Sequence, residues 1–370
     1  MMEIIVCNKS MDRIFNMESK DPKIVAAVSN WSYRFVSNGI HLSDFNDVAN
    51  SVSVWDDWCP AWEEKGRMHA ELAEKSISSD FLLSAGAHYN TAAVCCHFGK
   101  FLFVHDEEVM KKTHKLAVEY HRKSLKLQNP MAERVTIDWD GLEMIGNLRK
   151  PSNILNPPIV IMVMGLDSAK EEMETNERVF LDRGMATLSF DGPGQGESEY
   201  TSIICPEYEK PVTAVIDFIE KRDDLDSSRI GVWGVSLGGY YAPRAAAFDD
   251  RIKACISLTG PFNWNNIFDL IPGLTKDAFM KRSNTKNEKE AREFASRMDL
   301  SNCASNIKCP LYIVGGGLDR VVPPDESKLL AEAAKGEVTY NMIEDATHVA
   351  NNRIYKYRTQ TADWMSAKLK

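Results

Sequence analysis

From about residue 131 onward, short apolar runs alternate with stretches of helical spacing. Each run has the length of a buried strand, and the intervening stretches carry apolar residues on one helical face. The predicted strands are Ile159–Met164, Ala186–Phe190, Arg229–Trp233, Ala254–Leu258, Leu311–Val314 and Val338–Ile343. The predicted helices between them include Glu171–Arg183, Pro211–Lys221 and Glu326–Ala334. This alternation is typical of an α/β protein whose mostly parallel sheet is flanked by helices.

The pattern differs before Met131. Arg134–Trp139 and Leu142–Leu148 flank Asp140-Gly141, a pair that predicts a two-residue hairpin turn. Upstream of the hairpin there is no convincing parallel-strand pattern, and the helix-period stretches are Ala70–Lys75, Phe81–Phe103 and Glu107–Leu127. We therefore predict an all-helical domain over residues 1–130 and a second domain over residues 131–370.

The clearest chemical motif is Gly234-Val235-Ser236-Leu237-Gly238. It follows the apolar run Ile230–Trp233 and precedes a helix predicted over Gly239–Ala247. A turn this tight strains the backbone, so the positions that flank the serine must be nearly free of side chain. The pentapeptide alone arises by chance in many chains, where its serine is an ordinary turn residue. Its place between a strand and a helix favours Ser236 as an exposed nucleophile.

A serine nucleophile needs a base, and the base needs an acid to orient it. His348 is the only histidine after residue 121, and it follows the last predicted strand. Asp319 follows the strand Leu311–Val314 and a glycine-rich turn, whereas Asp325 and Asp345 are rival acids that fit a helix start or a loop more simply. The order Ser236, Asp319, His348 predicts a serine, acid, histidine triad.

The negative oxygen formed by attack on a carbonyl needs two backbone donors. We predict the N–H of Leu237, beside the nucleophile, and the N–H of Leu166, in the turn after Ile159–Met164. The loop Asp191–Ser198 carries several glycines but lacks the third glycine of a dinucleotide fingerprint, so we expect no nucleotide cofactor. The cysteines show no zinc spacing, and we expect no metal. We interpret this loop as the floor of the same site.

Composition narrows the function further. The 370 residues are 44% hydrophobic and 26% charged, which is typical of a globular protein. The net charge of −9 and the pI near 5.5 argue against nucleic-acid binding, which favours a basic surface. No apolar run is long enough to span a membrane. The start, Met1–Asn8, lacks the basic region of a signal peptide. The eight cysteines show no C-x-x-C or zinc spacing, which favours a reducing cytoplasm.

These features resemble the α/β-hydrolase superfamily over roughly residues 131–370. Asp191–Ser198 matches its D-x-x-G-x-G-x-S loop. Gly165–Ser168 with Lys170–Glu172, behind a helical region, is similar to the group that contains dihydroxypseudooxynicotine hydrolase, the fungal polyketide-shortening hydrolases and the fermentation-respiration-switch-like proteins. The resemblance implies a helical cap domain packed over the hydrolase domain with the substrate between them, and a homodimer. Several members hydrolyse a carbon–carbon bond beside a ketone, and others are treated as esterases.

The residues predict a cofactor-independent serine hydrolase, and the resemblance implies that it cleaves a carbon–carbon bond beside a ketone in an aromatic or polyketide-like small molecule. A carboxylesterase with the same triad is the first alternative, and a non-catalytic ligand-binding module is the second. Residues 263 to about 300 interrupt the alternation, with a charged helix predicted near Asn287–Arg297, and this insertion could help cover the site. In the helical domain His88, Tyr89 and His97 are candidate pocket residues that ordinary packing or surface exposure explains more simply, and none is predicted to be catalytic. The exact substrate stays open.

Overall fold

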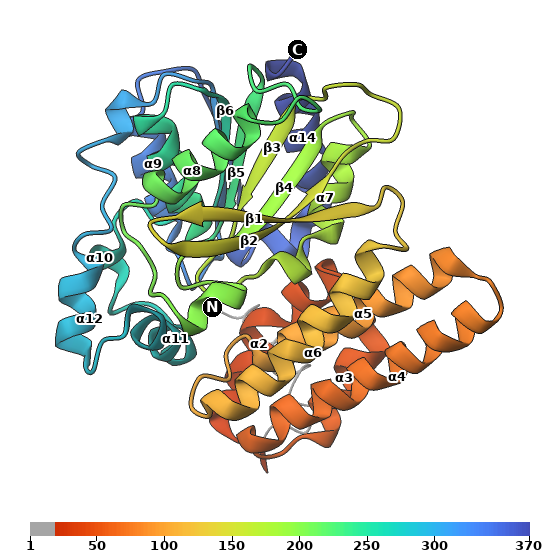
Figure 1. The fold of residues 1–370 in the computed structure, drawn as a ribbon. Coiled ribbons are helices and arrows are strands. Elements are labelled where there is room, and N and C mark those ends of the chain that lie inside the picture. The colour runs from red at the N-terminus through yellow and green to blue at the C-terminus, as the bar shows by residue number, and fades with distance from the viewer. Residues whose placement is uncertain (1–18) are drawn as a thin grey trace. The chain divides into compact units, whose positions relative to one another are not determined.

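A computed structural model describes residues 19–370. The chain divides into two compact units, Met1–Asn129 and Pro130–Lys370 (Figure 1). The prediction for Met1–Asn8 and the residue Cys7 lie outside the described residues. The seven cysteines within them are all free thiols.

The first unit is helical in its described part. Its α-helices are α2 (Pro22–Ser37), α3 (Leu42–Ser51), α4 (Trp58–Ser78), α5 (Leu82–Lys100) and α6 (Glu107–Leu125). Sequence analysis missed α2 and α3 and found only the end of α4. Pro60 lies in the first turn of α4, where its missing N–H breaks no helical hydrogen bond, so it does not stop the helix.

Aromatic side chains form much of the core of this unit. Trp58 and Trp62 are completely buried, and Phe35 stacks on Phe98 with ring centroids 4.2 Å apart. Trp31 and Trp55 are also buried. These rings fill space between helices, as the sequence interpretation expected.

The second unit contains one eight-stranded sheet in the order β1-β2-β4-β3-β5-β6-β7-β8. The strands are β1 (Ala132–Trp139), β2 (Leu142–Arg149), β3 (Ile159–Val163), β4 (Ala186–Asp191), β5 (Ile230–Val235), β6 (Ile252–Leu258), β7 (Leu311–Gly316) and β8 (Val338–Ile343). Strands β3 to β8 are parallel, and the hairpin β1–β2 joins them through an antiparallel pairing of β2 with β4. The predicted fold class, a mostly parallel α/β sheet, is confirmed.

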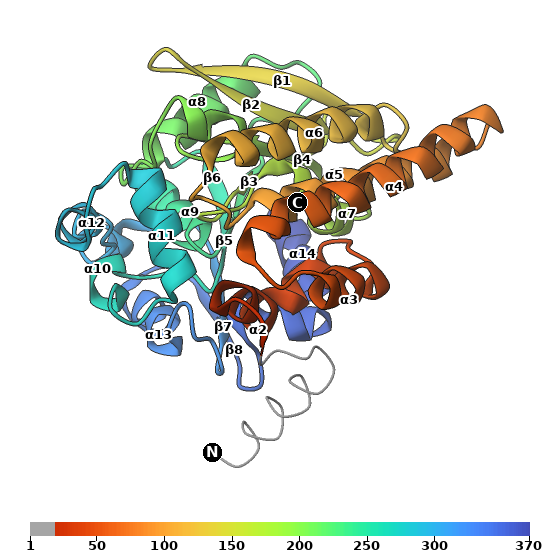
Figure 2. The ribbon, with the colours of Figure 1, turned by 90° about the horizontal axis from the view of Figure 1, so that it is seen from below.

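Helices flank the sheet on both faces. Helices α8 (Glu209–Glu220) and α9 (Gly238–Phe248) pack together, with α9 against β5 and β6, whereas α7 (Glu174–Leu181) and α14 (Arg358–Lys368) pack together on the opposite face (Figures 1 and 2). Helix α13 (Pro324–Ala333) packs against β7 and β8. Every residue of β3, β4 and β5 is buried, which explains their continuous apolar runs.

The order in which strands are added to the sheet reverses at β3, because β4 lies on one side of β3 and β5 lies on the other. Ligands of open parallel sheets bind outside the carboxyl ends of the strands at such a switch point. Leu166 follows the end of β3 and Ser236 follows the end of β5. The topology therefore places both predicted site residues at this point.

The segment after β6 is an insertion of three helices, α10 (Trp264–Ile267), α11 (Gly273–Ser283) and α12 (Glu288–Ala295). Trp264 and Phe279 stack with ring centroids 5.3 Å apart and form its small core. Helix α12 is the charged helix predicted near Asn287–Arg297. The insertion contacts the Asp191–Ser198 loop, since Arg282 donates to the Gly194 carbonyl at 2.9 Å.

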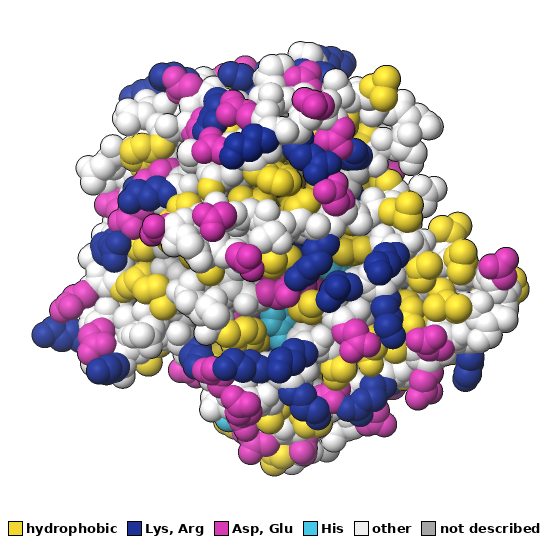
Figure 3. Space-filling model, viewed as in Figure 1, with side chains coloured by type: hydrophobic (Ala, Val, Ile, Leu, Met, Phe, Trp, Pro, Cys, Tyr) yellow, Lys and Arg dark blue, Asp and Glu magenta, His cyan; other side chains and the backbone are white. Residues whose placement is uncertain are grey.

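Two features concern the surface. Among the described residues, no helix combines the length and the apolar character that crossing a bilayer requires. On the face drawn in Figure 3, lysine and arginine side chains are interspersed with aspartate and glutamate.

Candidate active site

Ser236 occupies a strained turn between β5 and α9. Its φ is +56°, in the left-handed region, and its N–H donates to the Leu258 carbonyl at 2.9 Å. A Cβ at Gly234 would lie 1.9 Å from the Gly238 carbonyl oxygen, and a Cβ at Gly238 would lie 2.2 Å from the Val163 carbonyl oxygen. The two glycines are therefore required by close approach of the backbone. The turn leaves the serine side chain partly exposed although its neighbours are buried.

His348 links Ser236 to Asp319. Its Nε2 lies 2.8 Å from Ser236 Oγ, and its Nδ1 lies 2.7 Å from Asp319 Oδ2. The structure thus brings together three residues that are separated by up to 112 positions in the sequence. Each follows the carboxyl end of a parallel strand: β5 for the serine, β7 for the aspartate and β8 for the histidine.

The Asp319 carboxylate is fixed on both of its oxygens. Oδ1 accepts from the N–H of Val321 at 2.8 Å and from the N–H of Val322 at 2.9 Å, which leaves Oδ2 for the histidine. The side chain is 1% exposed. An ionised carboxylate in this position stabilises the His348 tautomer that carries its proton on Nδ1, so Nε2 is free to accept the serine proton.

The rival acids lie in other surroundings. Asp345 pairs with Arg353 and with Lys356, each at 2.7 Å, and these two cations lower the pKa of its carboxyl to about 2. Asp325 is exposed in the first turn of α13. Only Asp319, among these three aspartates, has a hydrogen bond to His348 in the described structure.

The loop that carries His348 is itself strained. Val349 and Ala350 have φ of +59° and +50°, values that cost free energy for residues with a Cβ. Two contacts hold the loop. The N–H of Val349 donates to Thr259 Oγ1 at 3.2 Å, and the N–H of Thr347 donates to Asn352 Oδ1 at 2.9 Å. Such strain persists where the surroundings fix it, and it clusters at functional sites.

The turn after β3 lies directly against the serine. A Cβ at Gly165 would be 3.0 Å from the Val235 carbonyl oxygen and 3.2 Å from Ser236 Cβ. In the described structure, neither the Leu166 N–H nor the Leu237 N–H donates a backbone hydrogen bond outside helices and strands. The two predicted donors therefore belong to turns that contact or contain the nucleophile, but their role stays a prediction.

Comparison with known proteins identifies the family. The sequence profile of the prolyl oligopeptidase family matches residues 172–370, more than half of the chain. The chain is an α/β-hydrolase of this family. It is 35% identical to 2,6-dihydropseudooxynicotine hydrolase of Paenarthrobacter nicotinovorans over 91% of this chain and 90% of that protein.

Two further similarities extend this result. The crystal structure of 2,6-dihydroxy-pseudo-oxynicotine hydrolase superposes with a TM-score of 0.85 at 33% identity, over 92% of this chain and 96% of that one. The 20-hydroxy-prefusarin hydrolase of Gibberella moniliformis is 32% identical over 56% of this chain and 53% of its own length. The first of these covers both units, so this α/β-hydrolase shares the helical region as well as the sheet with its relative. The predicted recognition is confirmed.

After the turn that follows β3 the hydrolase holds a cluster of charges whose residues the sequence analysis named only as parts of two motifs, without predicting that they pair. Lys170 Nζ lies 2.5 Å from Glu171, 2.6 Å from Asp191 and 2.7 Å from Glu197. Lys170 is 1% exposed. Burial alone lowers the pKa of Lys170, but the three carboxylates raise it above its usual value, so the amine stays charged. We call these four residues the Lys170 cluster.

The three acids of the Lys170 cluster have the composition of a cation site, since their carboxylate oxygens lie within 4.8 Å of one another. The ammonium group of Lys170 already occupies the centre between them. The cluster therefore holds its own cation, and Glu197 pairs with a second cation, Arg134, at 2.8 Å. Its Asp191 also accepts from the N–H of Lys170 at 3.0 Å and from the N–H of Glu197 at 2.9 Å, which ties two loops together.

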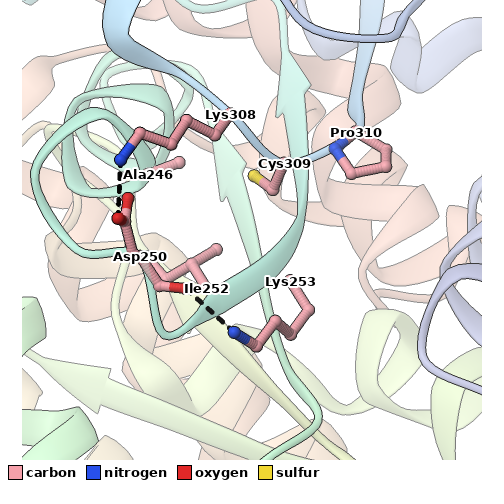
Figure 4. A pocket seen from close by; sticks show the side chains of 7 residues that line it. All are labelled: Ala246, Asp250, Ile252, Lys253, Lys308, Cys309 and Pro310. Atoms are coloured by element: carbon pink, nitrogen blue, oxygen red, sulfur yellow. Dashed lines mark hydrogen bonds and ion pairs between the residues drawn. The ribbon is translucent and has the colours of Figure 1, made fainter.

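A cavity of about 350 Å³ lies at the other end of the sheet (Figure 4). Its lining includes Ile252, where β6 begins, and Pro310, directly before β7. Lys308 Nζ lies 2.6 Å from an Asp250 carboxylate oxygen across this cavity. Because β5 and β6 are parallel, the start of β6 lies at the opposite sheet edge from Ser236. The cavity therefore takes no part in the serine site.

The candidate pocket residues of the helical unit lie on α5. His97 is completely buried beside the Phe98 ring, and Tyr89 is buried with its hydroxyl donating to Glu74. His88 is half-buried and near His69. Burial, and after it the neighbouring histidines, lower the pKa of His88. For Tyr89 and His97 these contacts are those of core packing.

Proposed function

We propose that this α/β-hydrolase uses Ser236 as nucleophile, His348 as general base and acid, and Asp319 as the group that orients the histidine. The observation that carries the proposal is the continuous hydrogen-bonded path from Ser236 Oγ through both ring nitrogens of His348 to a buried carboxylate. This arrangement converts a weak hydroxyl into a nucleophile without a cofactor.

We further propose that the bond cleaved is a carbon–carbon bond beside a ketone, in an aromatic or polyketide-like small molecule. The support is the likeness to 2,6-dihydropseudooxynicotine hydrolase over nine tenths of both chains, together with the ketone cleavage that resemblance to this group implies. A ketone supplies the carbonyl that the serine attacks. The departing carbon must be able to carry a negative charge, as an enolate or an electron-rich ring carbon does.

The steps balance as hydrolysis. His348 takes the Ser236 proton while Oγ bonds to the carbonyl carbon, and the N–H groups of Leu166 and Leu237 stabilise the resulting oxyanion. The carbon–carbon bond then breaks, its electron pair leaves with the departing carbon, and His348 returns the proton to that carbon. Water, deprotonated by His348, releases the acyl group as a carboxylic acid.

The first experiment tests the nucleophile. Intact-protein mass is measured after incubation with a fluorophosphonate, for the wild type and for Ser236→Ala. We expect one adduct on the wild type and none on the variant. No adduct on folded wild-type protein would overturn the proposed triad and favour a ligand-binding module.

The second experiment distinguishes ketone from ester cleavage. Aryl β-diketones that carry no exchangeable hydrogen on the carbon between the two carbonyls, and matched aryl esters, are supplied in D₂O, and the released fragments are analysed by mass spectrometry. Carbon–carbon hydrolysis places one new carbon-bound deuterium on the leaving fragment, because His348 delivers a solvent proton to carbon. Ester hydrolysis leaves no carbon-bound deuterium. Turnover of the esters alone would make the protein a carboxylesterase with the same triad.

A further inference from the structure

The Gln195 side chain lies between the turn after β3 and Tyr208. It is completely buried, and its Nε2 donates to the Met164 carbonyl at 2.9 Å and to the Gly165 carbonyl at 2.7 Å. Its Oε1 accepts from the Tyr208 hydroxyl at 2.6 Å. We propose that Gln195, oriented by Tyr208, is a positioning residue that holds the Leu166 N–H toward the reacting oxygen. This inference rests on the proposed function.

The direction of the Gln195 amide is determined by its partners. Two carbonyl oxygens can accept only from the NH₂ group, and a hydroxyl donor is matched by the amide oxygen. Burial raises the pKa of Tyr208 well above its usual value, so the hydroxyl keeps the proton that it donates. All three hydrogen bonds therefore require one and the same orientation of the amide.

Holding a carbonyl also directs the next N–H. The peptide unit is planar and trans, so its C=O and N–H point to opposite sides. Gln195 binds the Gly165 carbonyl, and the Leu166 N–H of the same peptide unit must point away from Gln195. The Met164 carbonyl is held in the same way. The two contacts therefore hold the N–H groups of Gly165 and Leu166 on the side of the turn that faces away from Gln195.

The turn needs this support because of its own composition. A Cβ at Gly165 would lie 3.0 Å from the Val235 carbonyl oxygen, so a larger residue would require the serine turn to move. Glycine, however, adopts many backbone conformations at little cost. A free Gly165–Leu166 peptide could rotate and present a carbonyl where a donor is required. Side-chain hydrogen bonds from a neighbouring loop remove that freedom.

The Asp191–Ser198 loop is built to keep Gln195 in place. A Cβ at Gly192 would lie 2.0 Å from the Tyr208 hydroxyl, and one at Gly196 would lie 2.1 Å from the Asp191 carboxylate. The loop is thus packed against Tyr208 and against its own Asp191 side chain, without room for side chains at Gly192 and Gly196. Tyr208 in turn stacks on Tyr241 of α9, with ring centroids 3.8 Å apart. The helix behind the nucleophile and the turn after β3 are therefore connected through Tyr208 and Gln195.

The test compares Gln195→Met, which keeps the shape of the side chain and removes its donors, with Gln360→Met as a control at an exposed position of α14. Fluorophosphonate inactivation is measured over a range of concentrations, so that the limiting rate and the binding constant are separated. Loss of one oxyanion donor costs about a hundredfold or more in rate, and we expect misplacement to lower the limiting rate about tenfold to a hundredfold. The binding constant should change less than about twofold, because the donor acts on the transition state.

An aryl trifluoromethyl ketone provides a second readout, since it forms a tetrahedral oxyanion on a serine nucleophile. Its affinity should fall in parallel with the limiting rate for Gln195→Met and for Tyr208→Phe. Equal rates and affinities in folded Gln195→Met and wild type would overturn the inference. If Gln195→Met does not fold, wild-type behaviour of Tyr208→Phe would do the same. Failure of the wild type to label at all would instead contradict the proposed function.

Discussion

Replacing Asp319 with asparagine should abolish most of the activity while the fold remains. The structure determines how the new amide would lie. Asp319 Oδ1 accepts from the N–H groups of Val321 and Val322, and an NH₂ group in that place would face two donors. Leaving two buried N–H groups unsatisfied costs about 1–3 kcal/mol each, so the amide oxygen stays with the valines.

The NH₂ group of Asp319→Asn must then point at His348. It donates to Nδ1, which forces the imidazole proton onto Nε2, and Nε2 can no longer accept the proton of Ser236. A serine hydrolase with this change loses about 10⁴-fold in kcat, or about 5 kcal/mol of transition-state stabilisation. Because both backbone hydrogen bonds remain, we expect the free energy of unfolding to fall by less than about 2 kcal/mol.

The assay is the fluorophosphonate inactivation rate at neutral pH, with urea unfolding followed in parallel. Asp325→Asn is the matched control, since Asp325 is an exposed aspartate on α13. Its inactivation rate should equal that of the wild type. The reasoning is refuted if Asp319→Asn keeps more than a tenth of the wild-type rate, or if the control loses as much.

Three further predictions concern the turn after β3, the Lys170 cluster and Glu326, a buried acid of α13 that accepts from the N–H groups of Phe262 and Asn263 at 2.8 Å each. Gly165→Ala places a Cβ 3.0 Å from the Val235 carbonyl oxygen, and it should slow fluorophosphonate inactivation at least tenfold; an unchanged rate would show that the turn can shift freely. Lys170→Met leaves the buried carboxylates of Glu171 and Asp191 without their cation, and it should lower the free energy of unfolding in urea by about 3–5 kcal/mol; a loss below about 1 kcal/mol would contradict the buried charge. Burial raises the pKa of Glu326, so the folded state binds more protons than the unfolded state between the usual and the raised pKa. The stability of the wild type should therefore fall relative to that of Glu326→Gln as the pH rises above the usual pKa of glutamate, about 4.3, and a relative rise would contradict the raised pKa of Glu326.

Much of the fold could be predicted because buried parallel strands appear as continuous apolar runs. The predicted strand Ile159–Met164 differs from β3 by one residue at its end, and Val338–Ile343 coincides with β8. Helices of the first unit were harder to find. The prediction for α4 began at Ala70 although the helix begins at Trp58, since its first turns carry large aromatic residues and a proline whose compatibility depends on position.

The three residues of the hydrogen-bonded path could be named from the sequence for a physical reason. Ser236, Asp319 and His348 each follow a predicted parallel strand, and the carboxyl ends of parallel strands share one edge of the sheet. Chain order and strand position were therefore enough to predict that the three residues lie near one another. The sequence favoured Asp319 over Asp325 and Asp345 as the acid, and Asp319 is the one of these three that hydrogen-bonds to His348 in the described structure.

The support of the site depends on tertiary structure alone. Gln195 and Gly165 are 30 positions apart, and they meet because β4 lies beside β3, so the loops after the two strands come into contact. Lys170 was named from the sequence only as part of a motif, and the structure buries it among carboxylates. Periodicity determines which residues a strand or helix buries and where each strand ends. Which polar side chains then pair is determined only when the sheet assembles, because hydrogen bonds and ion pairs depend on distances that no local pattern contains.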